Sequence, residues 1–398
     1  MDSSERVLAR IPRSELERRW QMVRDHMRRK NLDVLIFQAN GDSILGGPVR
    51  WITGFPVGAY MEVVLFPVDD LMTLIQHGSI GERRRYQGDE PDHPGVGEVI
   101  STATFFSAQF THDYEARIVL TEVERRGWRR IGLVRAGQWP HGFARSLIEG
   151  VSGAAELIDE SEFIERCKAI KSAEERAMLR RTCAMQDEVF ARIIRQIKPG
   201  MRDVEVASLA RHEGNRIGSD GEGVFLTASA RLGEPAFHGP HHLQGRTIAQ
   251  GDHLNILIEN NSDQGYYAEI SRNIVFGKAS SELLEGFEIA KAAQENTLRR
   301  LKPGASCKEI YAAHAEFLKA KQLPPELRLY CHGQGYDLVE RPLIRDDETM
   351  TLEPHMFLAC HPPYVSATTV AVICDNYFVD QDGASECVHQ TPKKVFEL

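Results

Sequence analysis

The sequence predicts an α+β protein of two domains, and three observations support this fold class. The chain has 398 residues, which is more than one hydrophobic core usually organises. Its first part alternates helical and strand patterns, as a small α/β domain does. The remainder contains a unit of two helices followed by strands, and this unit occurs twice. We therefore expect an N-terminal α/β domain over residues 1–160 and a larger domain over residues 161–398.

The N-terminal domain is expected to begin with a helix over residues 14–30, because Leu16, Trp20, Val23 and Met27 recur at helical spacing. Strands are expected at four apolar runs, over residues 32–37, 61–67, 71–76 and 130–134. The second and third runs are separated only by Val-Asp-Asp and therefore predict a hairpin.

The larger domain is expected to open with one long helix over residues 165–195, in which Ser172 and Glu175 fit a capping box. The motif Lys-Pro-Gly follows a helix at residues 198–200 and again at 302–304. Two copies of such a unit can pack about a pseudo-twofold axis and bury one curved antiparallel sheet under four helices.

The composition restricts the class of partner. A net charge of −9 and an isoelectric point near 6.0 give no support to nucleic-acid binding. Seven cysteines without a Cys-x-x-Cys pair indicate reduced thiols. No apolar run approaches the length of about 18 residues that a membrane span needs, and the N-terminus lacks the apolar segment of a signal peptide. The sequence thus predicts a cytoplasmic protein that acts on a small molecule.

Two glutamates form the most informative feature of the chain. A strand ends on Glu259, a turn at Asp263-Gln264-Gly265 reverses the chain, and the returning strand presents Glu269. Such a hairpin can set two acids side by side. Two carboxylates so near to each other need a cation, a shared proton or a positively charged substrate to offset their repulsion.

Several motifs of the larger domain resemble those of the creatinase, aminopeptidase P and methionine aminopeptidase superfamily. These motifs are IKSAEE, IKPG, LKPG, GDHLNILIENN, GYYAEISRNIVFG, CHGQGYDLVERP, LEPHMFLACHPP and VICDNYFVDQDG. The resemblance implies the pita-bread fold, with its pseudo-twofold repeat and curved antiparallel sheet, preceded by a smaller creatinase-type α/β domain.

The metallopeptidase branch of this superfamily binds two divalent ions through two aspartates, a histidine and two glutamates. The matching positions here are Glu259, Glu269, His332, His361 and Cys374. Two carboxylates would leave a pair of dications under-neutralised. We therefore expect a site without a cofactor, as the resemblance to creatinase and ectoine hydrolase implies. A single ion on Glu269, His332, His361 and Cys374 is the alternative, since these donors suit zinc.

On the metal-independent interpretation, the protein hydrolyses a C–N bond of an amidine, guanidine or amide. His238 stands in a His-Gly-Pro that looks like the His-Asn-Pro of creatinase, and it is the expected proton carrier, with His241 and His242 as rivals. Glu259 and Glu269 bind the cationic group, or Glu269 attacks directly. His332 and His361 line the same cavity and are assigned to catalysis with them.

Four further residues are expected to bind the substrate. Glu340 follows Val339, which occupies the place of the family's second histidine, and Cys374 is a small buried residue or a nucleophile. Arg50 and Trp51 lie in RWITGF, which resembles the Tyr-Leu-Thr-Gly-Phe loop of the creatinase branch. That resemblance implies a homodimer in which the N-terminal domain of the partner completes each active site.

Two other functions remain open from the sequence. The first is a single-metal hydrolase resembling Xaa-Pro aminopeptidase, or a lyase on the same fold. The second is an inactive binding protein of this fold, although the histidines and glutamates kept at the ligand positions argue against such decay.

Overall fold

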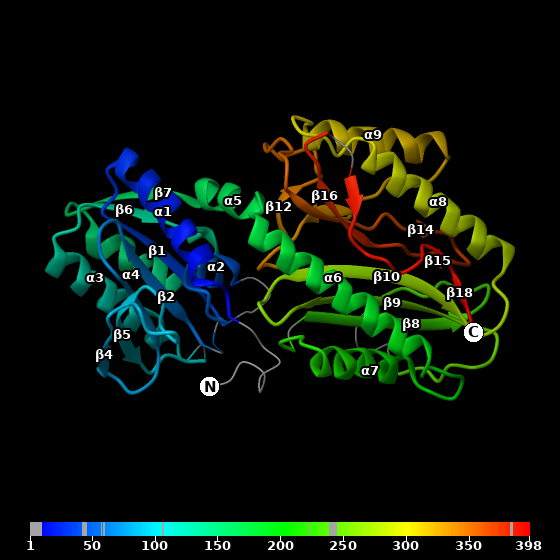
Figure 1. Cartoon of the computed structure of the whole chain (residues 1–398), viewed down its shortest axis with the longest axis horizontal. Coiled ribbons are helices and arrows are strands. Elements are labelled where there is room, and N and C mark those ends of the chain that lie inside the picture. The colour runs from blue at the N-terminus through cyan, green and yellow to red at the C-terminus, as the bar shows by residue number, and fades with distance from the viewer. Residues whose placement is uncertain are drawn as a thin grey trace. The chain divides into compact units, whose positions relative to one another are not determined.

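The computed structural model describes residues 10–398, except 42–45, 57, 59, 106, 222, 239–244 and 383–384. The chain forms two compact units, of which the first spans Arg10–Lys168 and the second holds Ala169–Leu398 (Figure 1). In the described part of the chain, no helix is long and apolar enough to cross a membrane.

The first unit is built on a mixed seven-stranded sheet with the strand order β4-β5-β3-β2-β1-β6-β7. The strands are β1 (Val34–Ala39), β2 (Glu62–Pro67), β3 (Met72–His77), β4 (Arg83–Arg85), β5 (Val96–Thr102), β6 (Arg130–Leu133) and β7 (Glu156–Asp159). The helices are α1 (Arg13–Lys30), α2 (Gly47–Thr53), α3 (Tyr114–Arg126), α4 (His141–Val151) and α5 (Ser161–Ala169), with short 3-10 turns at Gln109–Asp113 and Ala136–Gln138.

The predicted elements of this unit are confirmed. The four apolar residues of α1 that define its helical spacing are all at most 5% exposed. Strands β2 and β3 pair antiparallel as the expected hairpin, with Val64 opposite Leu74. The faces of these strands that carry Val63, Leu65 and Ile75 pack into one core with α3 and α4.

The second unit repeats a pair of helices followed by strands. Its first half contains α6 (Ala173–Ile194), α7 (Asp203–Arg216), β8 (Gly223–Arg231), β9 (Asp252–Asn261) and β10 (Tyr267–Val275). Its second half contains α8 (Ser281–Leu298), α9 (Cys307–Ala320), β11 (Cys331–Gly333), β12 (Glu340–Leu343), β13 (Phe357–Cys360), β14 (Tyr364–Val365), β15 (Val370–Ala371), β16 (Asp375–Val379), β17 (Ser385–Cys387) and β18 (Phe396–Glu397).

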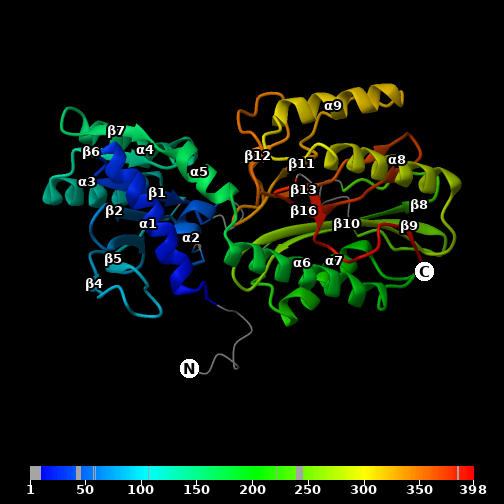
Figure 2. The ribbon, with the colours of Figure 1, turned by 45° about the horizontal axis from the view of Figure 1, so that its top comes forward.

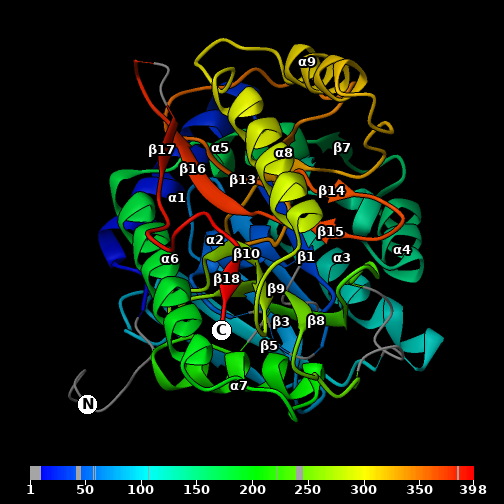
Figure 3. The ribbon, with the colours of Figure 1, turned by 90° about the vertical axis from the view of Figure 1, so that its right-hand side faces the viewer.

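The two halves place their sheets between the two helix pairs. One sheet has the order β18-β10-β9-β8 and the other β12-β11-β13-β16-β17. Figure 2 shows α6 and α7 below the first sheet and α8 and α9 above the second, and Figure 3 shows the second unit from its end, with α7 at the bottom and α9 at the top. The predicted helical repeat with its two Lys-Pro-Gly turns is confirmed, and so is the α+β pita-bread fold class.

The expectation of one helix over residues 165–195 is wrong. Helix α5 ends at Ala169, Ile170 pairs with Met356 in an isolated bridge, and α6 begins at Ala173. The reason is local, because Ser172 accepts from the backbone N–H of Glu175 and Glu175 accepts from that of Ser172. This capping box, predicted from the sequence, starts a new helix instead of lying inside one.

Arg272, in β10, connects the two halves of the second unit. Its side chain is fully buried and pairs with Asp375 at 2.6 Å. The guanidinium also donates to the carbonyl oxygens of Ser271, Cys374, Thr391 and Pro392. Ser271 and Cys374 exchange backbone hydrogen bonds of 3.3 and 3.1 Å. These contacts hold the strand that carries Glu269 against the segment that leads into β16.

His314 on α9 provides a test of the packing between this helix and the second sheet. Its ring is 1% exposed and stacks on Tyr330 with 3.7 Å between ring centroids. Burial lowers the pKa of His314 to about 4, against about 6.5 in an unfolded chain. The folded state therefore binds fewer protons, and stability is lost as the pH falls from about 6.5 to about 4.

We expect His314→Phe to remove part of this acid sensitivity, at most about 3 kcal/mol of the free energy of unfolding. Urea unfolding of both proteins at pH 7.5, 5.5 and 4.5 measures it. The exposed His212 on α7 supplies the control His212→Gln, which should follow the wild type at every pH. Equal pH profiles for His314→Phe and wild type would contradict the prediction.

Candidate metal centre and active site

The hairpin of β9 and β10 sets its two glutamates directly opposite each other. The antiparallel register pairs Glu259 with Glu269, and the turn between the strands uses Gly265 at φ 85°, a backbone conformation that glycine adopts without strain. Both glutamates are buried, at 6% and 4% exposed. The hairpin thus brings two acids together in a place from which water is largely excluded.

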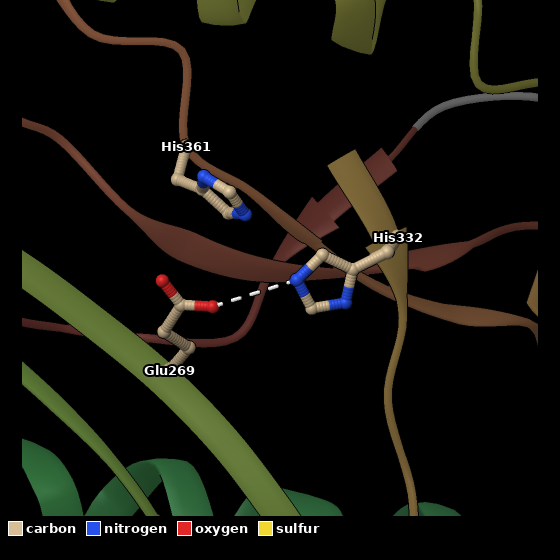
Figure 4. A group of neighbouring side chains, drawn as sticks. All are labelled: Glu269, His332 and His361. Atoms are coloured by element: carbon tan, nitrogen blue, oxygen red, sulfur yellow. Dashed lines mark ion pairs between the residues drawn. The ribbon is translucent and has the colours of Figure 1, made fainter. Parts of the chain in front are cut away.

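Two histidines approach the hairpin from the second sheet. His332 lies in β11, and His361 follows β13 and donates its backbone N–H to the carbonyl of Tyr330 at 2.8 Å. Their neighbours Cys331 and Cys360 pair across the strands and point into the core beneath α9. Because side chains alternate along a strand, both imidazoles point the other way, towards β10 (Figure 4).

Glu269, His332 and His361 form one compact group of possible metal ligands. One donor atom of each lies within 4.8 Å of the others, and His332 Nε2 is 3.7 Å from Glu269 Oε2 (Figure 4). The two imidazole rings are 5.2 Å apart and inclined by 67°. No other such group of His, Cys, Asp and Glu occurs among the described residues.

Both imidazoles are held in the neutral form that binds metals. His332 Nδ1 lies 3.0 Å from the carbonyl oxygen of Gly333, so this nitrogen carries the proton and donates it, which leaves the lone pair on Nε2 facing Glu269. Burial lowers the pKa of His332 to about 4 and that of His361 well below its ordinary value. Neither ring therefore needs to lose a proton before it binds a cation at pH 7.

The glutamate pair resists full ionisation. Burial raises the pKa of Glu269 to about 7. The pKa of Glu259 is raised well above its usual range, by burial first and by the charge of Glu269 second. A cation beside Glu269 would offset both effects, because opposite charge favours the carboxylate form.

Gln334 and Asn376, which the sequence analysis did not single out, orient the two acids. Gln334 Nε2 donates to Glu259 Oε1 at 2.8 Å, and Asn376 Nδ2 donates to Gln334 Oε1 at 2.7 Å. Asn376 Oδ1 accepts the backbone N–H of Glu269 at 2.7 Å. The available signal was the position of Gln334 in CHGQG, two residues after His332.

Cys374 lies beside the group without belonging to it. Its thiol contacts the carbonyl oxygen of Glu269 at 3.6 Å, and it is absent from the set of mutually close donor atoms. Burial, followed by the charge of Glu269, raises the pKa of Cys374 well above its ordinary value. The thiol is therefore protonated at neutral pH, which disfavours a nucleophilic role.

The other candidates occupy different surroundings. Burial lowers the pKa of His238 to about 4, which keeps it neutral at pH 7, although the ring donates a hydrogen bond to the backbone of Asn255 that raises its pKa by a smaller amount. Glu340 is paired with Lys171 at 2.8 Å and accepts the backbone N–H groups of Tyr336 and Asp337. His241 and His242 lie outside the described residues.

Arg50 and Trp51 belong to the first unit, in helix α2. Both side chains are buried, at 7% and 1% exposed, and the guanidinium of Arg19 stacks over the Trp51 ring at 5.4 Å. Arg19 also donates to the Trp51 carbonyl at 2.8 Å. In this structure Trp51 packs within its own unit, and its predicted contact with a substrate stays a prediction.

One carboxylate and two imidazoles fit a single transition-metal ion. Two His and one Glu form a known ligand set of catalytic zinc. Donor atoms bound to one tetrahedral zinc lie roughly 3.3 Å apart, so the 3.7 Å between Glu269 and His332 and the distances of up to 4.8 Å within the group would shorten on binding. Glu259 remains free of the ligand group and available as a proton carrier.

Comparison with known proteins identifies peptidases. The chain is 26% identical over 278 residues to the uncharacterized peptidase YqhT of Bacillus subtilis (strain 168), covering 69% of this chain and 77% of that protein. It is 24% identical over 235 residues to the probable dipeptidase PepE of Mycobacterium tuberculosis (strain ATCC 25618 / H37Rv), covering 58% and 62%. The crystal structure of X-Pro aminopeptidase from Thermotoga maritima MSB8 matches with a TM-score of 0.80 at 17% identity, over 95% of this chain and 99% of that one.

These relatives correct the predicted reaction. The expectation of a metal-independent hydrolase acting on an amidine, guanidine or other non-peptide C–N bond is wrong, because the relatives carry the names of peptidases and dipeptidases. The alternative of an enzyme resembling Xaa-Pro aminopeptidase agrees better with them.

The expected absence of a cofactor is wrong as well. The family model described as metallopeptidase family M24 matches residues 177–381, which is more than half of the chain. The argument from charge had excluded only a pair of dications, and a single ion on Glu269, His332, His361 and Cys374 was the alternative; the first three of these residues do lie together. The chain is a hydrolase of this fold, and it belongs to metallopeptidase family M24.

Proposed function

We propose that the protein is a single-metal peptidase that cleaves the amide bond of a short peptide, with one divalent ion held by Glu269, His332 and His361. The observation that supports this proposal is the mutual approach of three donor atoms within 4.8 Å. The names of the relatives support the peptide class of substrate.

The charges of the site favour one ion over two. The group supplies one carboxylate, and the second carboxylate, Glu259, is already engaged by Gln334 at 2.8 Å. A second dication would have to bind Cys374 and Glu259. Burial raises the pKa of the Cys374 thiol, and Glu259 already accepts a hydrogen bond from the amide of Gln334. Two neutral imidazoles and one carboxylate leave a net charge near +1, which is tolerable in a partly buried catalytic site.

A bound ion of this kind supplies Lewis-acid chemistry, in that it polarises the carbonyl oxygen of the substrate. Glu259, on the opposite strand, acts as the general base and then as the general acid. Its Oε1 is fixed by Gln334, so its other oxygen accepts the proton of the attacking water and returns it to the leaving amine. Burial and the charge of Glu269 raise the pKa of Glu259, and a raised pKa makes a carboxyl a better proton acceptor when it is ionised.

Metal analysis tests the proposal directly. Protein stripped with a chelator and then dialysed should regain hydrolysis of dipeptides on addition of Zn²⁺, and should bind one ion per chain. Mn²⁺, which prefers oxygen ligands, should restore less activity than Zn²⁺. Two tightly bound ions per chain, or full activity after chelation, would contradict the proposal.

The identity of the peptide and the assembly of the chain stay predictions. A panel of dipeptides with and without a carboxy-terminal proline measures the first, and sedimentation measures the predicted homodimer. His238 is kept in the proposal as a neutral imidazole that contacts the substrate.

A further inference from the structure

The first unit contains a cavity of ≈ 390 Å³ that plays no part in the proposed metal site. It opens beside the hairpin of β2 and β3 and is lined by polar and aromatic side chains, among them Phe55, Tyr60, Glu62, His77 and His93. A volume of this size falls in the range of pockets that hold small molecules.

Glu62 forms the charged floor of this cavity. It is the first residue of β2 and is 6% exposed. Val64 pairs with Leu74, and side chains two residues apart share a face, so Glu62 points to the same side as Leu74, which also lines the cavity. Among the residues that the structure describes, no Lys, Arg or His forms an ion pair with Glu62; the backbone N–H of Gly58 donates to it.

The lack of an ion-pair partner for Glu62 among the described residues has a measurable electrostatic consequence. Burial raises the pKa of Glu62 to about 7. A buried carboxylate without a cation costs free energy, and the cost appears as stability that is lost when the pH rises from about 4.5 to about 7. A positively charged guest in the cavity would remove this cost.

Aromatic rings form two walls of the cavity. Tyr60 stacks on His77 at 4.0 Å between ring centroids, and Phe55 lies 5.9 Å from His93. Nδ1 of His77 is buried and has no hydrogen-bond partner among the described residues. The faces of such rings attract organic cations.

We propose that this cavity binds a small organic ammonium ion, with the Glu62 carboxylate as counter-charge and the rings around it as the cage for its alkyl groups. An anion is disfavoured by Glu62, which lines the cavity. An uncharged apolar molecule would leave Glu62 buried and unpaired. An inorganic metal ion would find one carboxylate in a space far larger than its coordination sphere. The inference does not depend on the reaction at Glu269.

Calorimetric titration of the full chain at pH 8 tests this inference with butylammonium chloride, tetramethylammonium chloride and the neutral analogue 1-butanol, at matched ionic strength. We expect both cations to bind and 1-butanol to bind at least tenfold more weakly. Glu62→Gln, which keeps the shape and removes the charge, should weaken cation binding at least tenfold. Tyr60→Leu should weaken tetramethylammonium more than butylammonium.

The matched control is Asp69→Asn in the turn of the same hairpin, where the side chain is 72% exposed and pairs with Arg28. This variant should bind the cations within twofold of wild type. Glu62→Gln should also melt at a higher temperature than wild type at pH 8, which shows that it folds. Equal cation affinity in Glu62→Gln and wild type, equal affinity of wild type for butylammonium and 1-butanol, or no cation binding by wild type overturns the inference.

Discussion

Glu269→Gln is expected to abolish both metal binding and peptide hydrolysis, with kcat/KM lowered by about 10³-fold or more. The substitution removes the sole negative charge of the donor group formed with His332 and His361. An amide oxygen is a far weaker ligand for a dication than a carboxylate. Because glutamine has the size of glutamate, the hairpin should fold as before. Metal content and kcat/KM on dipeptides are measured on the same preparation.

The variant Glu259→Gln distinguishes the role of proton carrier from that of metal ligand. Glu259 faces Glu269 but lies outside the donor group, so this variant should keep its ion and lose rate, chiefly in kcat. Glu288→Gln, at an exposed site on α8, serves as the control and should retain both. If Glu269→Gln binds zinc as tightly as wild type, the assignment of the ligands is incorrect.

Arg272→Met is expected to lower the free energy of unfolding by about 3–5 kcal/mol. The variant removes the nearer ion-pair partner of Asp375, which is fully buried and then keeps a 3.8 Å ion pair with Lys393. Four backbone carbonyls lose a donor at the same time. Urea denaturation of the zinc-free protein measures the change without a contribution from metal binding.

Two comparison variants identify the cause of the loss. Arg345→Met removes a guanidinium whose partner, Asp347, is 67% exposed, and it should cost no more than about 1 kcal/mol. Adding Asp375→Asn to Arg272→Met should recover part of the stability, because the stranded charge is then gone. A loss below about 1 kcal/mol for Arg272→Met would show that the buried pair does not hold the two halves together.

The sequence predicted the elements whose signal is local. The helix of residues 14–30 and the hairpin that faces Glu259 with Glu269 follow from periodicity and turn residues alone. The break between α5 and α6 did not follow from periodicity, because Ile170 leaves the helix to pair with Met356, far along the chain. Such a long-range pairing has no counterpart in the local pattern.

Three of the predicted site residues lie together in the structure, while the roles of all of them stay predictions. Glu269, His332 and His361 come together as the motifs implied. Gln334, however, was missed, and its hydrogen bond to Glu259 distinguishes the surroundings of that glutamate from those of Glu269. The count of charges could not reveal this, since hydrogen bonding between particular side chains depends on the register of β9 against the loop after β11.

The donor group draws on both halves of the second unit. Glu269 comes from β10, in the half that begins with α6, whereas His332 and His361 come from the half that begins with α8. A cut in the connection between β10 and α8 would therefore yield two fragments that are each inert. Mixing them would restore hydrolysis only as fast and as completely as they reassociate. The recovered activity would therefore measure the association of the two halves.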